Sequence, residues 1–271
     1  MIKIFIACGI VFAVALVLGV ALCLLDRFFS VPVDERKKKT RDCLPGINCG
    51  ACGYKGCDDY AAALAAGEAG PNLCVPGGAE VAEAISTLLG MESSGQTART
   101  VAFVHCNGTC DAVEQKTVYD GINTCRAASM LYGGPSACRF GCLGCGDCAA
   151  VCPADAICVR DGVARVDSRL CIGCGMCAAT CPKKIISMIP QQTRAVVYCS
   201  SKDKGAVART ACKNACIGCK KCEKACPSGA ITVANNLATV DAGKCTGCGA
   251  CTAGCPTGCL KMVYTTDPVE E

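Results

Sequence analysis

The stretch Cys142-Leu-Gly-Cys145-Gly-Asp-Cys148-Ala-Ala-Val-Cys152-Pro153 decides how the rest of the chain is interpreted. A second stretch repeats its spacing, Cys171-Ile-Gly-Cys174-Gly-Met-Cys177-Ala-Ala-Thr-Cys181-Pro182. Each has the pattern C-x2-C-x2-C-x3-C-P, in which three closely spaced thiolates bind one iron–sulfur cluster and the fourth cysteine binds the other. Zinc is the alternative, but it prefers paired C-x2-C ligands. The pattern therefore predicts one 4Fe–4S cluster on Cys142, Cys145, Cys148 and Cys181, and another on Cys171, Cys174, Cys177 and Cys152.

Both stretches recur 74 residues later in the chain. Residues between the cysteines also match, as in Ala156-Ile157 with Ala230-Ile231 and Val166-Asp167 with Val240-Asp241. Duplication of a whole unit is the simplest explanation. It predicts a third cluster on Cys216, Cys219, Cys222 and Cys255, and a fourth on Cys245, Cys248, Cys251 and Cys226.

The cysteine content limits the class of protein. The 271 residues include 31 Cys and no Trp, so an ordinary hydrophobic core is thin. A secreted disulfide scaffold is the alternative, but closely spaced triples and an odd cysteine count do not favour it. Reduced intracellular thiols that bind clusters, and thereby drive folding, fit better. The net charge is only +4, and neither a basic patch with interleaved aromatic residues nor a P-loop is present, so no nucleic-acid partner is expected.

The amino-terminal segment is predicted to be a membrane anchor, residues 1–27. Residues 4–25 form an uncharged run that would be about 33 Å long as a helix, enough to cross a bilayer core. A cleavable signal peptide is the alternative, but its apolar region is shorter and ends in a small-residue cleavage site. Basic residues follow the run, which by the positive-inside rule places the bulk of the chain in the cytoplasm. Residues 28–42 are expected to be an extended basic tether.

A different motif follows, Leu44-Pro-Gly-Ile-Asn-Cys49-Gly-Ala-Cys52-Gly-Tyr-Lys-Gly-Cys57, with Cys74 further on. Its glycines allow the backbone to approach a cluster closely. Asp58 is a candidate cap for a helix that ends near Ala66, and a second helix is expected from Ala79 to Leu89. The sequence predicts a small helical 4Fe–4S domain over residues 43–92. Cys43 is interpreted as a non-ligand.

An anchor, this motif and ferredoxin modules in succession resemble the B subunit of the Rnf complex, an ion-translocating ferredoxin:NAD oxidoreductase of bacterial membranes. The resemblance covers essentially the whole chain. Shorter family members have one ferredoxin module, so this chain is similar to the longer, clostridial-type form. The resemblance implies a fifth cluster on Cys49, Cys52, Cys57 and Cys74.

The connecting segment, residues 93–138, contains a possible strand, Val101–Val104, and four more thiols. They are a candidate sixth site, made of Cys106, Cys110, Cys125 and Cys138. The alternative is that they are not a set: a shift of 74 gives Cys125 and Cys138 the counterparts Cys199 and Cys212, whereas the other two have none. Cys138 also competes with Cys145 for the adjacent cluster. His105, the one histidine, is interpreted as incidental.

The ferredoxin modules are assigned to residues 139–190 and 191–271, the latter with a frayed tail from Asp267. Each is expected to hold a hairpin, 157–159 with 163–166 and 231–233 with 237–240, so the fold class is α+β. Four lysines crowd the second module's first motif. They form either a solvated face or a dock for an acidic partner: Lys213, Lys220, Lys221 and Lys224.

No side chain is expected to act as an acid, base or nucleophile, since the clusters carry the chemistry. The resemblance implies a single-pass subunit of the bacterial cytoplasmic (inner) membrane. It would take electrons from reduced ferredoxin and pass them to other subunits of an ion-pumping complex. A polyferredoxin-type carrier of a hydrogenase or dehydrogenase is an alternative, although such a carrier does not need the Cys49–Cys74 motif. A zinc-stabilised membrane scaffold is another.

Overall fold

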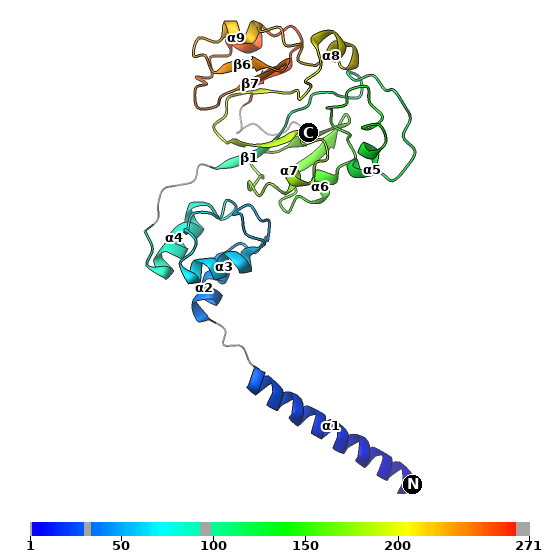
Figure 1. Cartoon of the computed structure of the whole chain (residues 1–271), viewed down its shortest axis with the longest axis vertical. Helices are drawn as coiled ribbons and strands as arrows, with labels where there is room; N and C mark the ends of the chain where they lie inside the picture. The colour runs from blue at the N-terminus through cyan, green and yellow to red at the C-terminus, as the bar shows by residue number, and fades with distance from the viewer. Residues whose placement is uncertain (1, 30–33, 93–98, 264–271) are drawn as a thin grey trace.

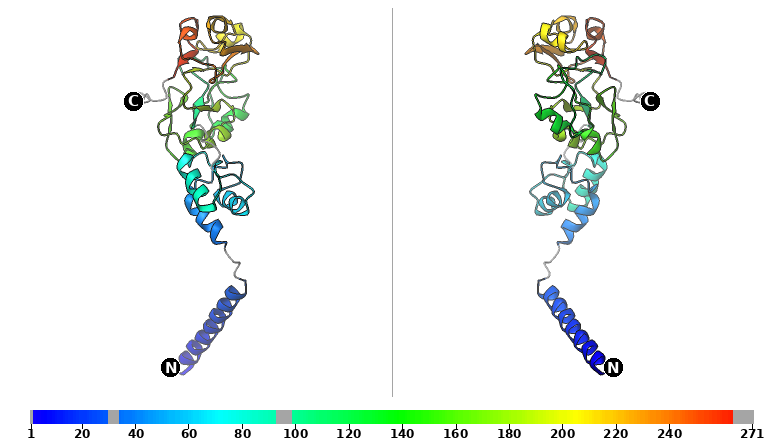
Figure 2. Two further views of the ribbon diagram at one scale, coloured as in Figure 1. Left: turned by 90° about the vertical axis from the view of Figure 1, so that its left-hand side faces the viewer. Right: turned by 90° about the vertical axis from the view of Figure 1, so that its right-hand side faces the viewer.

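The structure is a computed structural model that describes residues 2–29, 34–92 and 99–263. Most of the polar linker from Glu92 to Thr100 and the tail from Asp267 lie outside the described residues. Figure 1 shows the second ferredoxin module at the opposite end of the molecule from the amino-terminal helix, with the small domain and the first module between them. Figure 2 shows the same order from two further sides.

The amino-terminal helix α1 runs over Ile2–Phe29. The structure describes its side chains at residues 6, 9 and 12–25, and all of these are exposed. Within the described residues, no helix is both long and apolar enough to cross a membrane.

Helix α2, Glu35–Cys43, replaces the extended tether that the sequence suggested. Asp34 caps it by accepting a hydrogen bond from Arg36 N at 2.9 Å, and Glu35 pairs with Lys39 one turn later. Capping and such i,i+4 pairs stabilise even a strongly basic helix. Thr40 is fully buried and donates its hydroxyl to Arg36 O, which shows that α2 belongs to the small domain.

The small domain adds α3, Cys57–Ala66, and α4, Gly78–Leu89. Both predicted helices are thus confirmed, although Gly56, not Asp58, is the N-cap of α3. Each ends at a left-handed glycine, Gly67 or Gly90. Tyr60 is buried at the centre and its hydroxyl donates to Gly70 O at 2.7 Å.

The first ferredoxin module has two antiparallel strand pairs. Strand β1, Thr100–Val104, pairs with β4, Ile186–Pro190. The predicted hairpin is confirmed as β2, Ile157–Arg160, with β3, Val163–Val166. Three short helices complete the module: α5 Cys125–Met130, α6 Asp147–Ala150 and α7 Met176–Thr180. Its core combines aliphatic side chains such as Val163 with cysteines.

The second module repeats this plan. Its hairpin joins β6, Ile231–Ala234, to β7, Leu237–Val240, as predicted. Strand β5, Ala195–Val197, pairs with β8, Leu260–Met262. The remaining helices are α8 Gly205–Ala211, α9 Lys221–Ala225 and α10 Ala250–Ala253.

The two modules contact each other through the connecting segment. Val113 forms a β-bridge with Cys212, and Lys213 N donates to Ala112 O at 2.8 Å. His105 places its ring between the modules, with Nδ1 2.8 Å from Val197 O and Nε2 2.6 Å from Ser187 Oγ. The modules are therefore packed together rather than joined only by chain connectivity.

Candidate metal centres

Each of the four cysteine sets in the ferredoxin modules surrounds a pocket. The walls otherwise carry mostly aliphatic side chains, such as Ala164, Ile186, Ile157 and Met262. The cysteines that line the four pockets are, in turn, Cys142, Cys148 and Cys181 with Cys125; Cys152, Cys171, Cys174 and Cys177; Cys216, Cys219, Cys222 and Cys255 with Cys259; and Cys226, Cys245, Cys248 and Cys251. An apolar wall with several thiols is suited to a cluster, which needs ligands and shelter from water.

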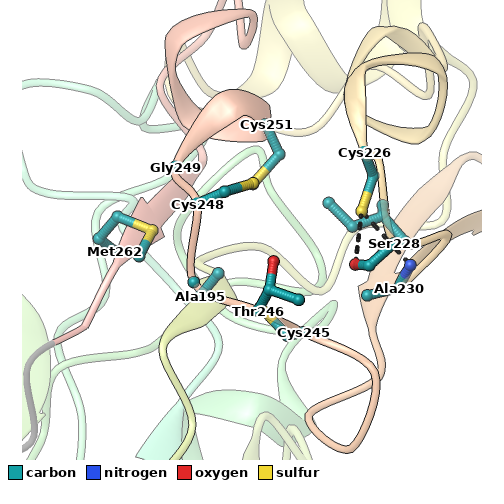
Figure 3. A pocket seen from close by; sticks show the side chains of 12 residues that line it. Ala195, Cys226, Ser228, Ala230, Cys245, Thr246, Cys248, Gly249, Cys251 and Met262 are labelled. Carbon is teal, nitrogen blue, oxygen red and sulfur yellow. Dashed lines mark hydrogen bonds between the residues drawn. The ribbon is translucent and has the colours of Figure 1, made fainter.

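The last of these pockets illustrates the geometry. Figure 3 shows Cys226 facing Cys248 and Cys251 across it, so the fourth cysteine comes from the other motif. Ala230 N donates to Cys226 Sγ at 3.3 Å, and Ser228 Oγ lies 3.5 Å from the same sulfur. Ala156 N makes the equivalent bond to Cys152 Sγ in the first module, also at 3.3 Å. Backbone amides thus already point at the sulfurs, as they do in cluster sites.

Glycine conformation shapes each motif. The residue before the second cysteine has positive φ in all four motifs, and at Gly144 a Cβ would come within 2.7 Å of Gly162 O. The residue after that cysteine is also left-handed and precedes a short helix that carries the third, buried cysteine. It is glycine in three motifs and Lys220 in the fourth, with φ of 59°. Only glycine adopts this conformation without strain, which explains its place in the motif.

Before cluster assembly, the thiols of these sites are mostly protonated. Burial raises the pKa of Cys148 to about 12, and charge on Cys142, Cys125 and Cys181 adds to the shift. Burial likewise raises the pKa of Cys177 and of Cys222 to about 11. Cys216 is the exception, because a hydrogen bond from Cys259 lowers its pKa to about 6. Iron bound to these sulfurs displaces the protons, so loading the sites releases protons.

The arrangement fits a cluster better than a single ion. Among the described residues, no three Cys, His, Asp or Glu side chains form a group that could hold one metal ion. A zinc ion draws four sulfurs to about 2.3 Å from one centre. A 4Fe–4S cube instead offers each thiolate its own iron, so the sulfurs surround a volume.

The small domain gathers its four cysteines near one another. Burial raises the pKa of Cys74, and charge on Cys57, Cys49 and Cys52 raises it further. Asn48 Oδ1 accepts a hydrogen bond from Cys57 N at 2.9 Å, which ties the motif loop to the start of α3. Cys43 packs at the edge of the same core. Charge on Cys49 also raises the pKa of Cys174, whose main cause is burial, so the small domain's motif lies near the first module's.

The structure does not bring the connecting segment's four thiols together as one group. Cys110 is exposed, and its sulfur would be 2.7 Å from a Cβ at Gly162. Cys125 hydrogen-bonds with Cys145, so it is Cys125, not Cys138, that lies beside that ligand. Cys106 is buried and within electrostatic reach of Cys138.

One contact was missed by the sequence analysis, which treated Cys259 as a packing residue. Its sulfur lies 3.7 Å from Cys255 Sγ and also contacts Cys216. Spacing gave no sign of this, because the first module has Ile185 at the corresponding position. Cys158, the other cysteine outside the pattern, lies in β2.

Family models match the chain at each of these sites. The FeS family model matches residues 44–76, and a model described as LdpA Fe-S cluster-binding domain matches 147–192. Two models described as 4Fe-4S dicluster domain match 170–231 and 215–259.

Curated relatives match over most of the chain. The B subunit of the Na(+)-translocating ferredoxin:NAD(+) oxidoreductase complex of Acetobacterium woodii is 42% identical over 87% of this chain and 71% of its own length. The B subunit of the proton-translocating complex of Clostridium ljungdahlii is 45% identical over 84% of this chain and 81% of its own length. The B subunit of an ion-translocating oxidoreductase complex of Methanosarcina acetivorans is 38% identical over 87% and 88%. The chain belongs to the family of B subunits of the Rnf complexes, the ion-translocating ferredoxin:NAD(+) oxidoreductases.

Proposed function

We propose that this chain is the iron–sulfur electron-transfer subunit of such a complex, and that it passes electrons from reduced ferredoxin to membrane partners. A 4Fe–4S cluster gains and loses one electron at a time. The chain's own residues bind the clusters, shelter them from water and adjust their potentials through hydrogen bonds to sulfur. Five clusters are proposed, with the ligands Cys49, Cys52, Cys57 and Cys74; Cys142, Cys145, Cys148 and Cys181; Cys171, Cys174, Cys177 and Cys152; Cys216, Cys219, Cys222 and Cys255; and Cys245, Cys248, Cys251 and Cys226.

The observation that carries this proposal is the pairing of each pocket with one motif set. The proximity of Cys49 to Cys174 supports a path from the first module to the small domain. Because the small domain follows α1 closely in the chain, it would deliver electrons nearest to the membrane subunits.

The uncharged residues 4–25 support a second element of the proposal, that α1 anchors the chain in the bacterial cytoplasmic membrane. Basic residues on its carboxy-terminal side favour a cytoplasmic location for the cluster-bearing part. Deleting residues 1–27 should leave a brown protein in the soluble fraction, whereas the full chain should sediment with membranes. A full chain that stays in the supernatant without partners or detergent would contradict the anchor.

Electrons would enter at the second module. Lys220 and Lys221 line the pocket of Cys216, Cys219, Cys222 and Cys255, and both are exposed with Lys224. Lys213 is also exposed, but its Nζ donates to Asp111 O and covers the connecting segment. An acidic ferredoxin would be attracted to this face by charge. Figure 1 places α9, which begins at Lys221, at the far end of the molecule from α1.

The test is to purify the full chain anaerobically in detergent, reconstitute it with iron and sulfide, and follow its reduction. At four irons per cluster, the five sites predict at least about 20 irons per chain. Reduced ferredoxin should bleach the brown colour within the mixing time of a rapid-kinetics experiment. A colourless protein containing zinc would support a structural scaffold instead, and a brown protein that ferredoxin cannot reduce would contradict the proposed donor.

A further inference from the structure

Two cysteines that no motif accounts for occupy the same position in the two halves of the molecule. Cys106 follows β1, and Cys199 follows β5. Gly108 N donates to Cys106 Sγ at 3.4 Å, and Ser201 N donates to Cys199 Sγ at 3.4 Å. Each sulfur thus accepts the amide of the residue two positions later.

A second bond at each sulfur links it to a motif cysteine. Cys142 N donates to Cys106 Sγ at 3.3 Å, and Cys216 N donates to Cys199 Sγ at 3.3 Å. Cys142 and Cys216 are themselves counterparts 74 residues apart, each the first cysteine of its module. The equivalence of Cys106 and Cys199 is therefore structural, and their sulfurs are held by backbone amides as ligand sulfurs are.

The sequence hides this equivalence because the connecting segment is longer in the first half. Cys106 and Cys138 are 32 positions apart, whereas Cys199 and Cys212 are 13 apart. Cys125 happens to precede Cys138 by the same 13 positions, so a uniform shift aligns it with Cys199. In the structure Cys125 lies beside Cys145 instead.

The four thiols meet where the modules pack together. Cys138, Cys199 and Cys212 pack in one apolar cluster with Val113 and Ala208. A Cβ on Gly108 would be 3.5 Å from Cys106 Sγ and 3.6 Å from Cys212 Sγ, so these sulfurs are no further apart than the sum of those distances. Burial raises the pKa of Cys106, Cys199 and Cys212, and charge on Cys138 raises each further, so Cys138 lies close to all three.

Backbone contacts between the halves hold this arrangement. Cys212 forms the β-bridge with Val113, and Asn214 Nδ2 donates to Asn107 O at 2.8 Å. The 19 extra residues of the connecting segment begin here, so the segment spans both modules. The site needs both halves, because each supplies two of the four thiols.

We propose that Cys106, Cys138, Cys199 and Cys212 hold a sixth 4Fe–4S cluster between the two ferredoxin modules. The two amide bonds at each of Cys106 and Cys199 are of the kind that tunes cluster sulfurs. Within the described residues these thiols do not form a single-ion site, in common with the five motif sets.

This inference rests on the proposed function and adds a step to it. The cluster would receive one electron from the cluster bound by Cys216, and would then pass that electron to the cluster bound by Cys142. No bond breaks and no proton is needed, and reduced ferredoxin is the reductant. The peptide amides of Cys216 and Cys142 contact this site directly, so it joins what would otherwise be two separate wires.

The experiment counts iron, sulfide and zinc in the full reconstituted chain and in two variants, Cys199→Ala/Cys212→Ala and Cys106→Ala/Cys138→Ala. The unaltered chain should hold about 24 irons and each variant about 20, since one cluster has four. Electron paramagnetic resonance of the dithionite-reduced samples should show one spin fewer in both variants. The matched control is Cys110→Ala/Cys158→Ala, which also removes two thiols and should keep about 24 irons.

Equal iron in the unaltered chain and both variants would overturn the sixth site, as would the loss of one zinc in place of four irons. Because the variants remove ligands from opposite halves, agreement between them excludes misfolding of one half as the cause. Counts well below 20 in the control as well would contradict the five proposed sites. The difference between control and variants would still decide the sixth.

Discussion

The two ferredoxin modules keep the same cysteine spacing but present different surfaces. In the first module, Lys183 donates its Nζ to Gly133 O and Arg139 O, at 2.5 and 2.6 Å. Arg139 forms an ion pair with Asp203 of the second module. These cations are therefore used within the molecule. In the second module, Lys220, Lys221 and Lys224 are exposed around Cys219, which is exposed too. Duplication preserved the ligands, whereas the surroundings diverged enough to give each module a different partner.

The sulfurs also differ between modules. Ser228 contacts Cys226 Sγ, but the residue 74 positions earlier is Ala154. Thr257 Oγ1 lies 3.8 Å from Cys255 Sγ, and its counterpart is Lys183, which turns to backbone carbonyls instead. A thiolate bound to iron has no proton to give, so in a loaded site these hydroxyls donate to sulfur. The second module's clusters therefore have donors that the first module's lack.

The largest expected effect tests the surface difference. Changing Lys220, Lys221 and Lys224 to Glu should slow reduction by ferredoxin at least about tenfold at low salt, because steering raises association rates by about 10–10³. Added salt should narrow the gap to the unaltered chain. Stopped-flow absorbance measures the rate, with dithionite reduction as the reference that needs no protein contact.

The matched control reverses three exposed cations around the first module, Arg126, Arg160 and Lys184. Its rate with ferredoxin should stay within about twofold of the unaltered chain, since charges more than a Debye length from the docking face are largely screened. If the control slows as much as the second-module variant, ferredoxin does not distinguish the modules.

The next effect concerns a spare thiol. Cys125 lines the pocket of Cys142, Cys148 and Cys181 and hydrogen-bonds with Cys145, so it is placed to replace Cys145. In the second module Cys259 lies on the buried side, against Cys216 and Cys255, rather than at the exposed corner of Cys219. Cys145→Ala should therefore keep its cluster, and Cys219→Ala should lose up to about four irons.

Iron analysis and electron paramagnetic resonance of the two single variants provide the measurement. Adding Cys125→Ala to Cys145→Ala should remove the cluster that the single variant keeps. If Cys145→Ala alone loses as much iron as Cys219→Ala, Cys125 does not act as a substitute ligand.

Local features were predictable from sequence, and long-range ones were not. The Cys142–Pro153 motif fixes its own turns and helix, so its pocket followed from spacing. The hairpin at Asp161-Gly162 followed from turn chemistry, and both residues do have positive φ. Strand β5 escaped prediction because its three residues pair with β8, more than 60 positions away.

The connecting segment shows why a repeat search can mislead. Its insertion breaks the shift of 74 before Cys138, so counting paired Cys199 with Cys125 although the structure pairs it with Cys106. Helix α2 was missed for a local reason: its charges resembled a tether, and only the capping by Asp34 and the burial of Thr40 indicate a helix within the domain.

The smallest expected effect tests the sulfur environments. A hydrogen bond to a cluster sulfur favours the reduced, more negative cluster and so raises its potential. Ser228→Ala should lower the potential of the cluster bound by Cys226 by about 20–60 mV, which corresponds to about 0.5–1.5 kcal/mol for one electron. Ala154→Ser should raise that of the cluster bound by Cys152 by a similar amount, because Ala156 N already holds Cys152 Sγ as Ala230 N holds Cys226 Sγ. Redox titration followed by electron paramagnetic resonance resolves such shifts. Opposite shifts in the two variants would show that one hydroxyl accounts for this difference between the modules, and unchanged potentials in both would show that Ser228 does not donate to the bound sulfur.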